Sequence, residues 1–351
     1  MFNNKIHIKK SVVSNKRTFV VAEISANHCG SLTLLKKMII KLKKANVDAI
    51  KIQAYEASTI TLNVKSQDFK INSNNTWAKY HYLYDLYKKA QTPFSWYEKI
   101  FKFCNKNHII VFASIFDYES LKKLEKLKCP AYKVASPEIT DIPLIFEIAK
   151  TKKPIIISSG LSNYKDLDLA VKTVKKAKNK NLILLKCTSS YPAELSELNL
   201  NTMKDMKKKF KCLVGYSDHT KDINVPIHAS SMGAVMLEKH VMLKKTKSVD
   251  SFFSIEINKF KKMISIIRQN EKSNGKIDYN ISKNAKKNLN GRRSLYVSKN
   301  IKLGEKFTVD NIKSVRPSFG LHPKYLKKFL NKETKKNLFI GDRLKWEYLK
   351  K

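Results

Sequence analysis

Polar and charged side chains recur at the ends of eight short apolar runs in this sequence. Burying such groups costs free energy unless they meet a partner or a ligand, so their repeated position needs a reason. In chain order they are Glu23, Lys51, Gln53, Ser114, Lys133, Ser136, Ser158, Lys186, Ser189, Ser217, His219, Glu238 and His240. We interpret them as one convergent set of candidate site residues.

Three lysines, Lys51, Lys133 and Lys186, lie in the second, fourth and sixth runs, with serines between them. Lysine ammonium groups and serine hydroxyls together suit a small ligand that carries both a phosphate and a carboxylate. In a chain so rich in lysine, a single lysine in a strand could arise by chance. Three at equivalent positions favour a binding site.

Two histidines, His219 and His240, end the seventh and eighth runs. Imidazoles at neighbouring strand ends, completed by Glu238 or water, could hold Mn, Mg, Fe or Zn, and oxygen ligands from a substrate would favour the harder ions, Mn or Mg. No third histidine fixes the identity of the metal. Glu23 has three open roles, which are acceptor for a substrate hydroxyl, general base, or ion-pair partner of Lys51.

The elements that would position these residues alternate regularly. Apolar, β-branched runs are separated by amphipathic segments, which predicts a parallel sheet covered by helices. The runs begin at residues 19, 49, 109, 131, 154, 182, 212 and 234. Eight such units predict a (β/α)8 barrel over residues 1–271, with the site at the carboxyl ends of its strands. An open doubly wound sheet is the alternative, but no G-x-G-x-x-G follows the first strand.

Two segments depart from this alternation. Residues 56–92, between the second and third runs, are expected to form part of the mouth. Residues 272–290 are polar and are expected to be a linker, and residues 291–351 are expected to form a small β-rich domain. A domain of this size is marginally stable alone, so we expect it to dock on the barrel or on a second subunit.

The composition bears on partners and compartment. The net charge is +41, but only six of the 70 basic residues are arginines. Arginine is preferred for base and phosphate contacts, so a dedicated nucleic-acid binder is disfavoured. No run of 18 apolar residues and no recognisable export signal is present, and five cysteines occur without a C-x-x-C pair. These features predict a cytoplasmic protein that does not cross a membrane.

Six strand-end motifs together resemble those of the sialic-acid-synthase family, and most of all its pseudaminic acid branch. They are AEISANHCGS from Ala22, AIKIQAY from Ala49, YKVASPEI from Tyr132, KCTSSYPA from Lys186, GYSDHT from Gly215 and LEKHV from Leu237. The resemblance continues through RRSLYV from Arg292 and VRPSFGLHP from Val315, in a segment similar to the antifreeze-like (SAF) domain of that family.

The resemblance implies condensation of phosphoenolpyruvate with a 2,4-diacetamido-trideoxy-hexose, giving a nine-carbon acid and phosphate. It implies that the strand-end lysines and serines surround phosphoenolpyruvate, that Glu23, Gln53 and Asp250 meet the sugar, and that His219 and His240 hold Mn or Mg. It also implies a homodimer in which Arg316 of the SAF domain reaches the partner's mouth. Legionaminic or N-acetylneuraminic acid would be alternative products.

Two departures from the family pattern flank the sugar side. Cys29 stands where asparagine is usual, and KTKSVDSFFS from Lys245 replaces a glycine-proline run. Two hypotheses from other classes are a basic nucleic-acid-binding protein and an aldolase that forms a Schiff base through Lys133 or Lys186.

Overall fold

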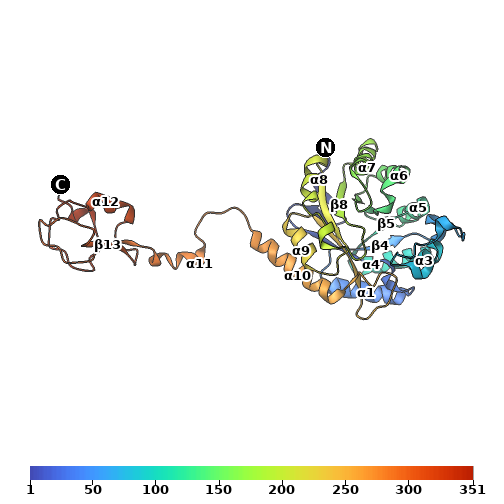
Figure 1. Ribbon diagram of the computed structural model, residues 1–351, viewed down its shortest axis with the longest axis horizontal. Coiled ribbons are helices and arrows are strands. Elements are labelled where there is room, and N and C mark those ends of the chain that lie inside the picture. Colours follow the sequence, from blue (N-terminus) through green and yellow to red (C-terminus); the bar gives the residue numbers. More distant parts are fainter. Residues whose placement is uncertain (351) are drawn as a thin grey trace. The chain divides into compact units, whose positions relative to one another are not determined.

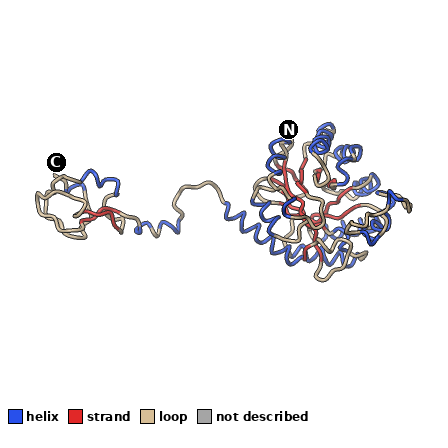
Figure 2. Tube along the Cα trace, in the orientation of Figure 1, coloured by secondary structure: helices blue, strands red, loops and turns tan. Residues whose placement is uncertain are grey.

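Eight parallel strands close into a barrel in the computed structural model, which describes residues 1–350 (Figures 1 and 2). Each strand pairs with its neighbours in chain order, and β10 pairs with both β9 and β3, which closes the sheet. The strands are β3 (Phe19–Glu23), β4 (Ala49–Ala54), β5 (Ile110–Ile115), β6 (Tyr132–Val134), β7 (Ile155–Ser158), β8 (Leu182–Cys187), β9 (Leu213–Asp218) and β10 (Met236–Met242). The predicted (β/α)8 barrel is confirmed.

Helices surround this barrel (Figure 2), and each contributes buried apolar side chains to its core. They are α1 (Leu32–Lys44), α4 (Phe94–Lys106), α5 (Tyr118–Lys126), α6 (Ile142–Lys150), α7 (Tyr164–Lys176), α8 (Thr202–Phe210), α9 (Asn224–Ser231) and α10 (Ile257–Asn274). In α1, Leu35, Met38 and Leu42 are buried at helical spacing, and the Ser31 hydroxyl accepts the Leu34 amide at 3.2 Å. This spacing and this N-cap explain why the segment is a helix.

An N-terminal hairpin, β1 (Lys5–Ile8) and β2 (Ser11–Ser14), precedes the barrel and was not predicted. Its alternate residues Ile6, Ile8 and Val13 are buried in the barrel core. The amide of Asn3 donates to the Lys180 carbonyl at 2.9 Å, just before β8 begins. The hairpin therefore covers the amino-terminal ends of the strands, opposite the predicted site.

The segment between β4 and β5 contains α2 (Ala57–Ile60), α3 (Leu83–Ala90) and short 3-10 turns at Gln67–Phe69 and Ala78–Tyr80. It has a small apolar cluster of its own, in which Ile71, Leu86 and Ala90 pack with Val249 from the loop after β10. That loop leads to the short strand β11 (Ile255–Glu256), which pairs with β10.

The chain divides into two compact units, residues 1–275 and 276–351. The second unit contains α11 (Lys283–Lys286), strands β12 (Ser294–Val297) and β13 (Ile312–Val315), and α12 (Leu326–Phe329). It has its own core, in which Leu295, Phe307 and Phe329 are fully buried. Apart from these two strands its pairing consists of isolated bridges, so it is more irregular than the predicted β-rich domain.

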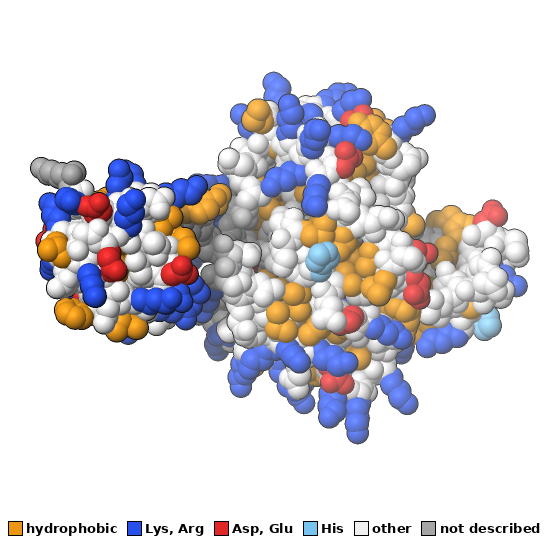
Figure 3. Space-filling view, turned by 60° about the vertical axis from the view of Figure 1, so that its left-hand side comes forward, with side chains coloured by type: hydrophobic (Ala, Val, Ile, Leu, Met, Phe, Trp, Pro, Cys, Tyr) orange, Lys and Arg blue, Asp and Glu red, His pale blue; other side chains and the backbone are white. Residues whose placement is uncertain are grey.

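Basic side chains are scattered over the surface of both units on the face shown in Figure 3, rather than gathered in a single patch. None of the helices in residues 1–350 combines the length and the apolar character that a bilayer crossing requires.

Candidate active site

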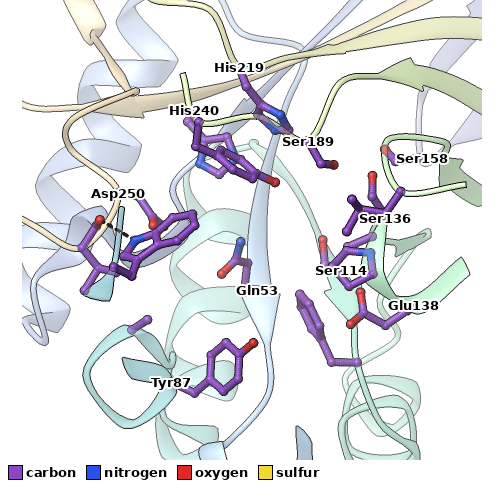
Figure 4. A pocket seen from close by; sticks show the side chains of 18 of the residues that line it. Gln53, Tyr87, Ser114, Ser136, Glu138, Ser158, Ser189, His219, His240 and Asp250 are labelled. Atoms are coloured by element: carbon purple, nitrogen blue, oxygen red, sulfur yellow. Dashed lines mark hydrogen bonds between the residues drawn. The ribbon is translucent and has the colours of Figure 1, made fainter. Parts of the chain in front are cut away.

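A cavity of about 580 Å³ opens where the carboxyl ends of the barrel strands meet the insertion between β4 and β5. Figure 4 shows its polar side chains converging from different strand ends. Of the predicted site residues, those that line it are Lys51, Gln53, Ser114, Lys133, Ser136, Ser158, Ser189, Ser217, His219, Glu238, His240 and Asp250. The structure therefore brings together twelve residues from segments far apart in the chain.

A buried network of two lysines and two carboxylates underlies the cavity, and three of its members, Lys51, Lys133 and Glu238, line it. Glu238 Oε1 lies 3.0 Å from Lys133 Nζ and 3.4 Å from Lys51 Nζ. Lys51 also forms an ion pair with Glu23 and donates to Ser114 Oγ at 2.6 Å. Burial disfavours the charge of Glu238, but Lys133 and Lys51 outweigh it and lower the pKa of this carboxyl to about 2. Glu238 is therefore ionised between two cations.

Hydroxyl groups form a second side of the cavity, where Ser136, Ser158 and Ser189 cluster in Figure 4. The side-chain oxygens of Ser158 and Ser189 are buried without a hydrogen-bond partner. Ser136 Oγ accepts the Gly160 amide at 3.0 Å, and a Cβ at Gly160 would clash with Ser189 Oγ. A side chain at position 160 would therefore displace the Ser189 hydroxyl, and with glycine there the hydroxyls of Ser158 and Ser189 are left free for a ligand.

His219 and His240 lie side by side at one end of the cavity (Figure 4), with ring centroids 5.4 Å apart. His219 Nδ1 lies 2.8 Å from the Thr188 carbonyl, which leaves Nε2 for another partner. Burial lowers the pKa of His240 well below its ordinary value, and the His219 charge adds to this effect. Nδ1 of His240 is buried without a hydrogen-bond partner. Burial opposes a charge on His219, but Cys187 and the Thr188 carbonyl outweigh it and raise the pKa of His219. His240 is therefore the neutral imidazole of the pair, and a ring nitrogen without a proton is a suitable metal ligand.

A buried ion pair lies behind these histidines. Asp218 and Lys239 are direct partners in the β9–β10 register, and each immediately precedes one histidine. Their side chains are at most 1% exposed, and Lys239 also donates to the Thr220 carbonyl at 2.5 Å. Because successive side chains on a strand point to opposite faces, this pair fixes the two strand ends from outside while the histidines face inwards.

Three predicted site residues do not line the cavity. On β8 the side chain of Cys187 points into the cavity, so that of its neighbour Lys186 points away from it. Lys186 Nζ instead donates to the Cys187 carbonyl at 2.7 Å. The predicted triad of lysines is therefore a pair in the structure. Glu23 is fully buried beneath Lys51, the arrangement expected of an ion-pair partner. Arg316 is exposed and belongs to the second compact unit.

Other cavity residues were missed by sequence reasoning. Glu138 follows Ser136 by two positions, in the Ser-Pro-Glu turn after β6, and its Oε2 is buried without a partner. Burial raises the pKa of Glu138 to about 7. Tyr191 and Phe253 pack on the two histidines, with centroids 4.4 Å from His219 and 4.7 Å from His240, respectively. Only the position of Glu138 two residues beyond a candidate serine signalled it in the sequence.

Cys29, one of the two departures from the family pattern, is exposed and lies beside the other. Its Sγ is 3.8 Å from the Lys247 carbonyl, and it borders a second cavity of about 420 Å³ next to the first.

Asp250 gives a pH-dependent prediction. Burial raises its pKa from 3.8 to about 7. Between these values the native state retains a proton that the unfolded chain has released, so wild-type stability falls as pH rises and levels off above pH 7. The Asp250→Asn variant has no carboxyl at this position and does not lose stability in this way. The difference in free energy of unfolding, variant minus wild type, should therefore be about 2 kcal/mol larger at pH 8 than at pH 5.

Urea unfolding of both proteins at the two pH values would measure this difference. Asp205→Asn, at an exposed position on α8, serves as the control and should give the same difference at both pH values. A pH-independent effect of Asp250→Asn would contradict the prediction.

Comparison with known proteins agrees with this geometry. The model of the NeuB family matches residues 38–279, and that of the SAF domain matches residues 292–350. The chain belongs to the NeuB family. Among its relatives, a pseudaminic acid synthase of Campylobacter jejuni subsp. jejuni (strain 81-176) is 43% identical, over 95% of this chain and 96% of that protein. The Helicobacter pylori pseudaminic acid synthase is 40% identical, over 91% and 94%.

Solved structures include a relative of this NeuB-family chain. The N-acetylneuraminic acid synthetase of Leptospira borgpetersenii serovar Hardjo-bovis, in complex with citrate, superimposes with a TM-score of 0.71 at 28% identity. The match covers 82% of this chain and 96% of that one.

Proposed function

We propose that this NeuB-family chain is a pseudaminic acid synthase, which condenses phosphoenolpyruvate with 2,4-diacetamido-2,4,6-trideoxy-L-altrose to give pseudaminic acid and phosphate. The observation that carries the proposal is one cavity containing two buried lysines, free serine hydroxyls and a facing pair of histidines. Identity of 40–43% to pseudaminic acid synthases over more than nine-tenths of the chain supports this product.

Phosphoenolpyruvate carries a phosphate and a carboxylate, and the polar side of the cavity provides for both. Lys51 and Lys133 supply fixed positive charge, while the unpartnered hydroxyls of Ser158 and Ser189 supply donors. In a buried site such preorganised groups stabilise the charge that develops as phosphate leaves. Ionised Glu238 holds both ammonium groups in place when the ligand is absent.

His219 and His240 would hold a divalent cation, Mn or Mg, and their free nitrogens fit that role. Among residues 1–350 no group of three or more His, Cys, Asp or Glu side chains is placed to bind a metal. Substrate oxygens and water would complete the shell, which favours these harder ions. A cation held there supplies a Lewis acid for the sugar aldehyde oxygen.

The reaction consumes one molecule each of phosphoenolpyruvate, sugar and water, and it yields one nine-carbon acid and one phosphate. The methylene carbon of phosphoenolpyruvate bonds to the aldehyde carbon, and the aldehyde oxygen takes a proton to become a hydroxyl. Water adds at C2, and the bond from C2 to the bridging oxygen breaks with release of phosphate. Lys51 and Lys133 orient the phosphate and carboxylate, and Gln53 and Asp250 orient the sugar.

The second unit belongs to the same proposal. Arg316 would meet an acetamido group of the sugar bound to a partner subunit, which makes the working form a homodimer in the cytoplasm. The exposure of Arg316, directly after β13, leaves its guanidinium available for such a contact.

Phosphate release tests the function. The protein is incubated with phosphoenolpyruvate, Mn and one sugar at a time, chosen as precursors of pseudaminic, legionaminic and N-acetylneuraminic acid. Release with the first sugar at more than about ten times the rate of the others, a 1.4 kcal/mol preference, supports pseudaminic acid. Release only with another sugar reassigns the product, and no release with any of them refutes the synthase.

A further inference from the structure

The cavity has an apolar side that the condensation chemistry does not use. It comes from the insertion between β4 and β5, which contributes Ile60, Ile71, Trp77, Leu83, Leu86 and Tyr87 together with the polar residues Asn74, Asn75 and Thr76. In Figure 4, Tyr87 of this insertion lies away from Ser136 and Ser158, so the insertion faces a different part of the cavity from the serines. One side suits phosphoenolpyruvate, and the other must face a ligand with apolar groups.

Trp77 connects this apolar side to two other loops of the mouth. Its Nε1–H donates to the Val249 carbonyl at 3.1 Å, in the loop after β10. Its ring packs edge-on against Phe252 at 5.6 Å and Tyr191 at 5.3 Å. Trp77 and Val249 also border both the main cavity and the smaller one beside it. Trp77 is therefore one of three residues, with Thr76 and Val249, that border both cavities.

A single aromatic ring, that of Tyr191, lies between Trp77 and the histidine pair. Tyr191 contacts Trp77 and also lies 4.4 Å from His219, centroid to centroid. A sugar whose aldehyde lies at the histidines must therefore extend its remaining carbons along Trp77 and the insertion. A sugar methyl group placed against Ile71, Trp77 and Leu83 gains from burial, whereas a hydroxyl there loses water and has to turn towards Asn74, Asn75, Thr76 or Tyr87 to find a hydrogen-bond partner.

We propose that Trp77, with the apolar face of residues 60–87, selects a 6-deoxy diacetamido sugar over a 6-hydroxy monoacetamido one. This inference rests on the proposed function and adds the residues that determine its specificity. A trideoxy diacetamido hexose presents three methyl groups, at C6 and in its two acetyl groups. N-acetylmannosamine presents only one and has hydroxyls in place of the other substituents.

The test compares kcat/KM for these two sugars, with phosphoenolpyruvate and Mn, in wild type, Trp77→Ala and Trp77→Phe. Loss of apolar contact in a specificity pocket changes discrimination by about 10–200-fold. Trp77→Ala should lower kcat/KM for the 6-deoxy sugar by at least about 10-fold and change that for N-acetylmannosamine by less than about 3-fold. Trp77→Phe should retain most of the preference, and KM for phosphoenolpyruvate should stay unchanged in both.

Two further variants keep the test decisive. Leu161→Ala also alters an apolar residue at the cavity, but one after β7 that is 57% exposed, and it should leave the sugar preference unchanged. Leu83→Asn places an amide in the apolar wall at similar volume, so it tests the wall even if Trp77→Ala does not fold. It should shift the preference towards N-acetylmannosamine by about 10-fold.

The outcomes separate the two proposals. If wild type converts neither sugar, the proposed function fails and this inference fails with it. If wild type prefers the 6-deoxy sugar but the Trp77 and Leu83 variants keep that preference, the specificity assignment alone is overturned.

Discussion

Replacement of His219 or His240 by alanine should lower the rate of condensation by about 1,000-fold or more, the largest loss expected of any single substitution. Each variant removes one of two facing imidazoles from a buried site where no third protein ligand of the described chain is placed to compensate. Charge stabilisation by a bound cation contributes several kcal/mol to a barrier, and each 1.36 kcal/mol is a factor of ten. Phosphate release at saturating Mn measures the effect.

Metal binding supplies a second measurement that does not depend on turnover. Titration of free Mn by electron paramagnetic resonance should show one site per wild-type chain, weakened in both variants. His228→Ala is the matched control, because His228 is exposed on α9, the helix that connects β9 to β10. If a histidine variant retained activity within about 3-fold of wild type, the metal assignment would be wrong.

Lys133→Met should raise KM for phosphoenolpyruvate by at least about 100-fold, because a buried charge pair with a ligand is worth about 2–5 kcal/mol. It should also destabilise the fold by about 3 kcal/mol, since Glu238 keeps only Lys51 as a cationic partner. Steady-state kinetics and urea unfolding measure the two effects separately.

Lys186→Met is the matched control for this lysine, because Lys186 lies at a strand end but outside the cavity. Its KM for phosphoenolpyruvate should change by less than about 3-fold. The double variant Lys133→Met/Glu238→Gln should regain stability but not activity, because no uncompensated charge remains. Trapping of a covalent adduct on Lys133 by borohydride would instead support the Schiff-base aldolase.

The barrel and most of the cavity were predictable because they depend on local patterns. Runs such as IIIS at Ile155–Ser158 are apolar on both faces, which occurs where helices cover a parallel sheet, and the polar residue at the end of each run marks the mouth. Lys186 lies outside the cavity because side chains alternate along a strand, so position in a run alone does not predict which side chains face inwards. The inward position on β8 belongs to Cys187.

Features formed by long-range packing were not predictable in the same way. The N-terminal hairpin has strands of only four residues, and its apolar positions are explained only by the barrel end that they cover. The role of Trp77 depends on loops that follow β8 and β10, more than 100 residues away along the chain. No periodicity within the insertion indicates those contacts. The same holds for the pairing of Asp218 with Lys239 behind the histidines.

The measurement that tests the central claim most directly uses phosphoenolpyruvate labelled with ¹⁸O at the bridging oxygen, together with the diacetamido sugar and Mn. Mass spectrometry of both products follows the label. The account predicts a nine-carbon acid and an equal amount of phosphate, with the label in the phosphate, because the C2–O bond breaks. Label retained in the organic product, or consumption of phosphoenolpyruvate without a nine-carbon acid, would contradict the account.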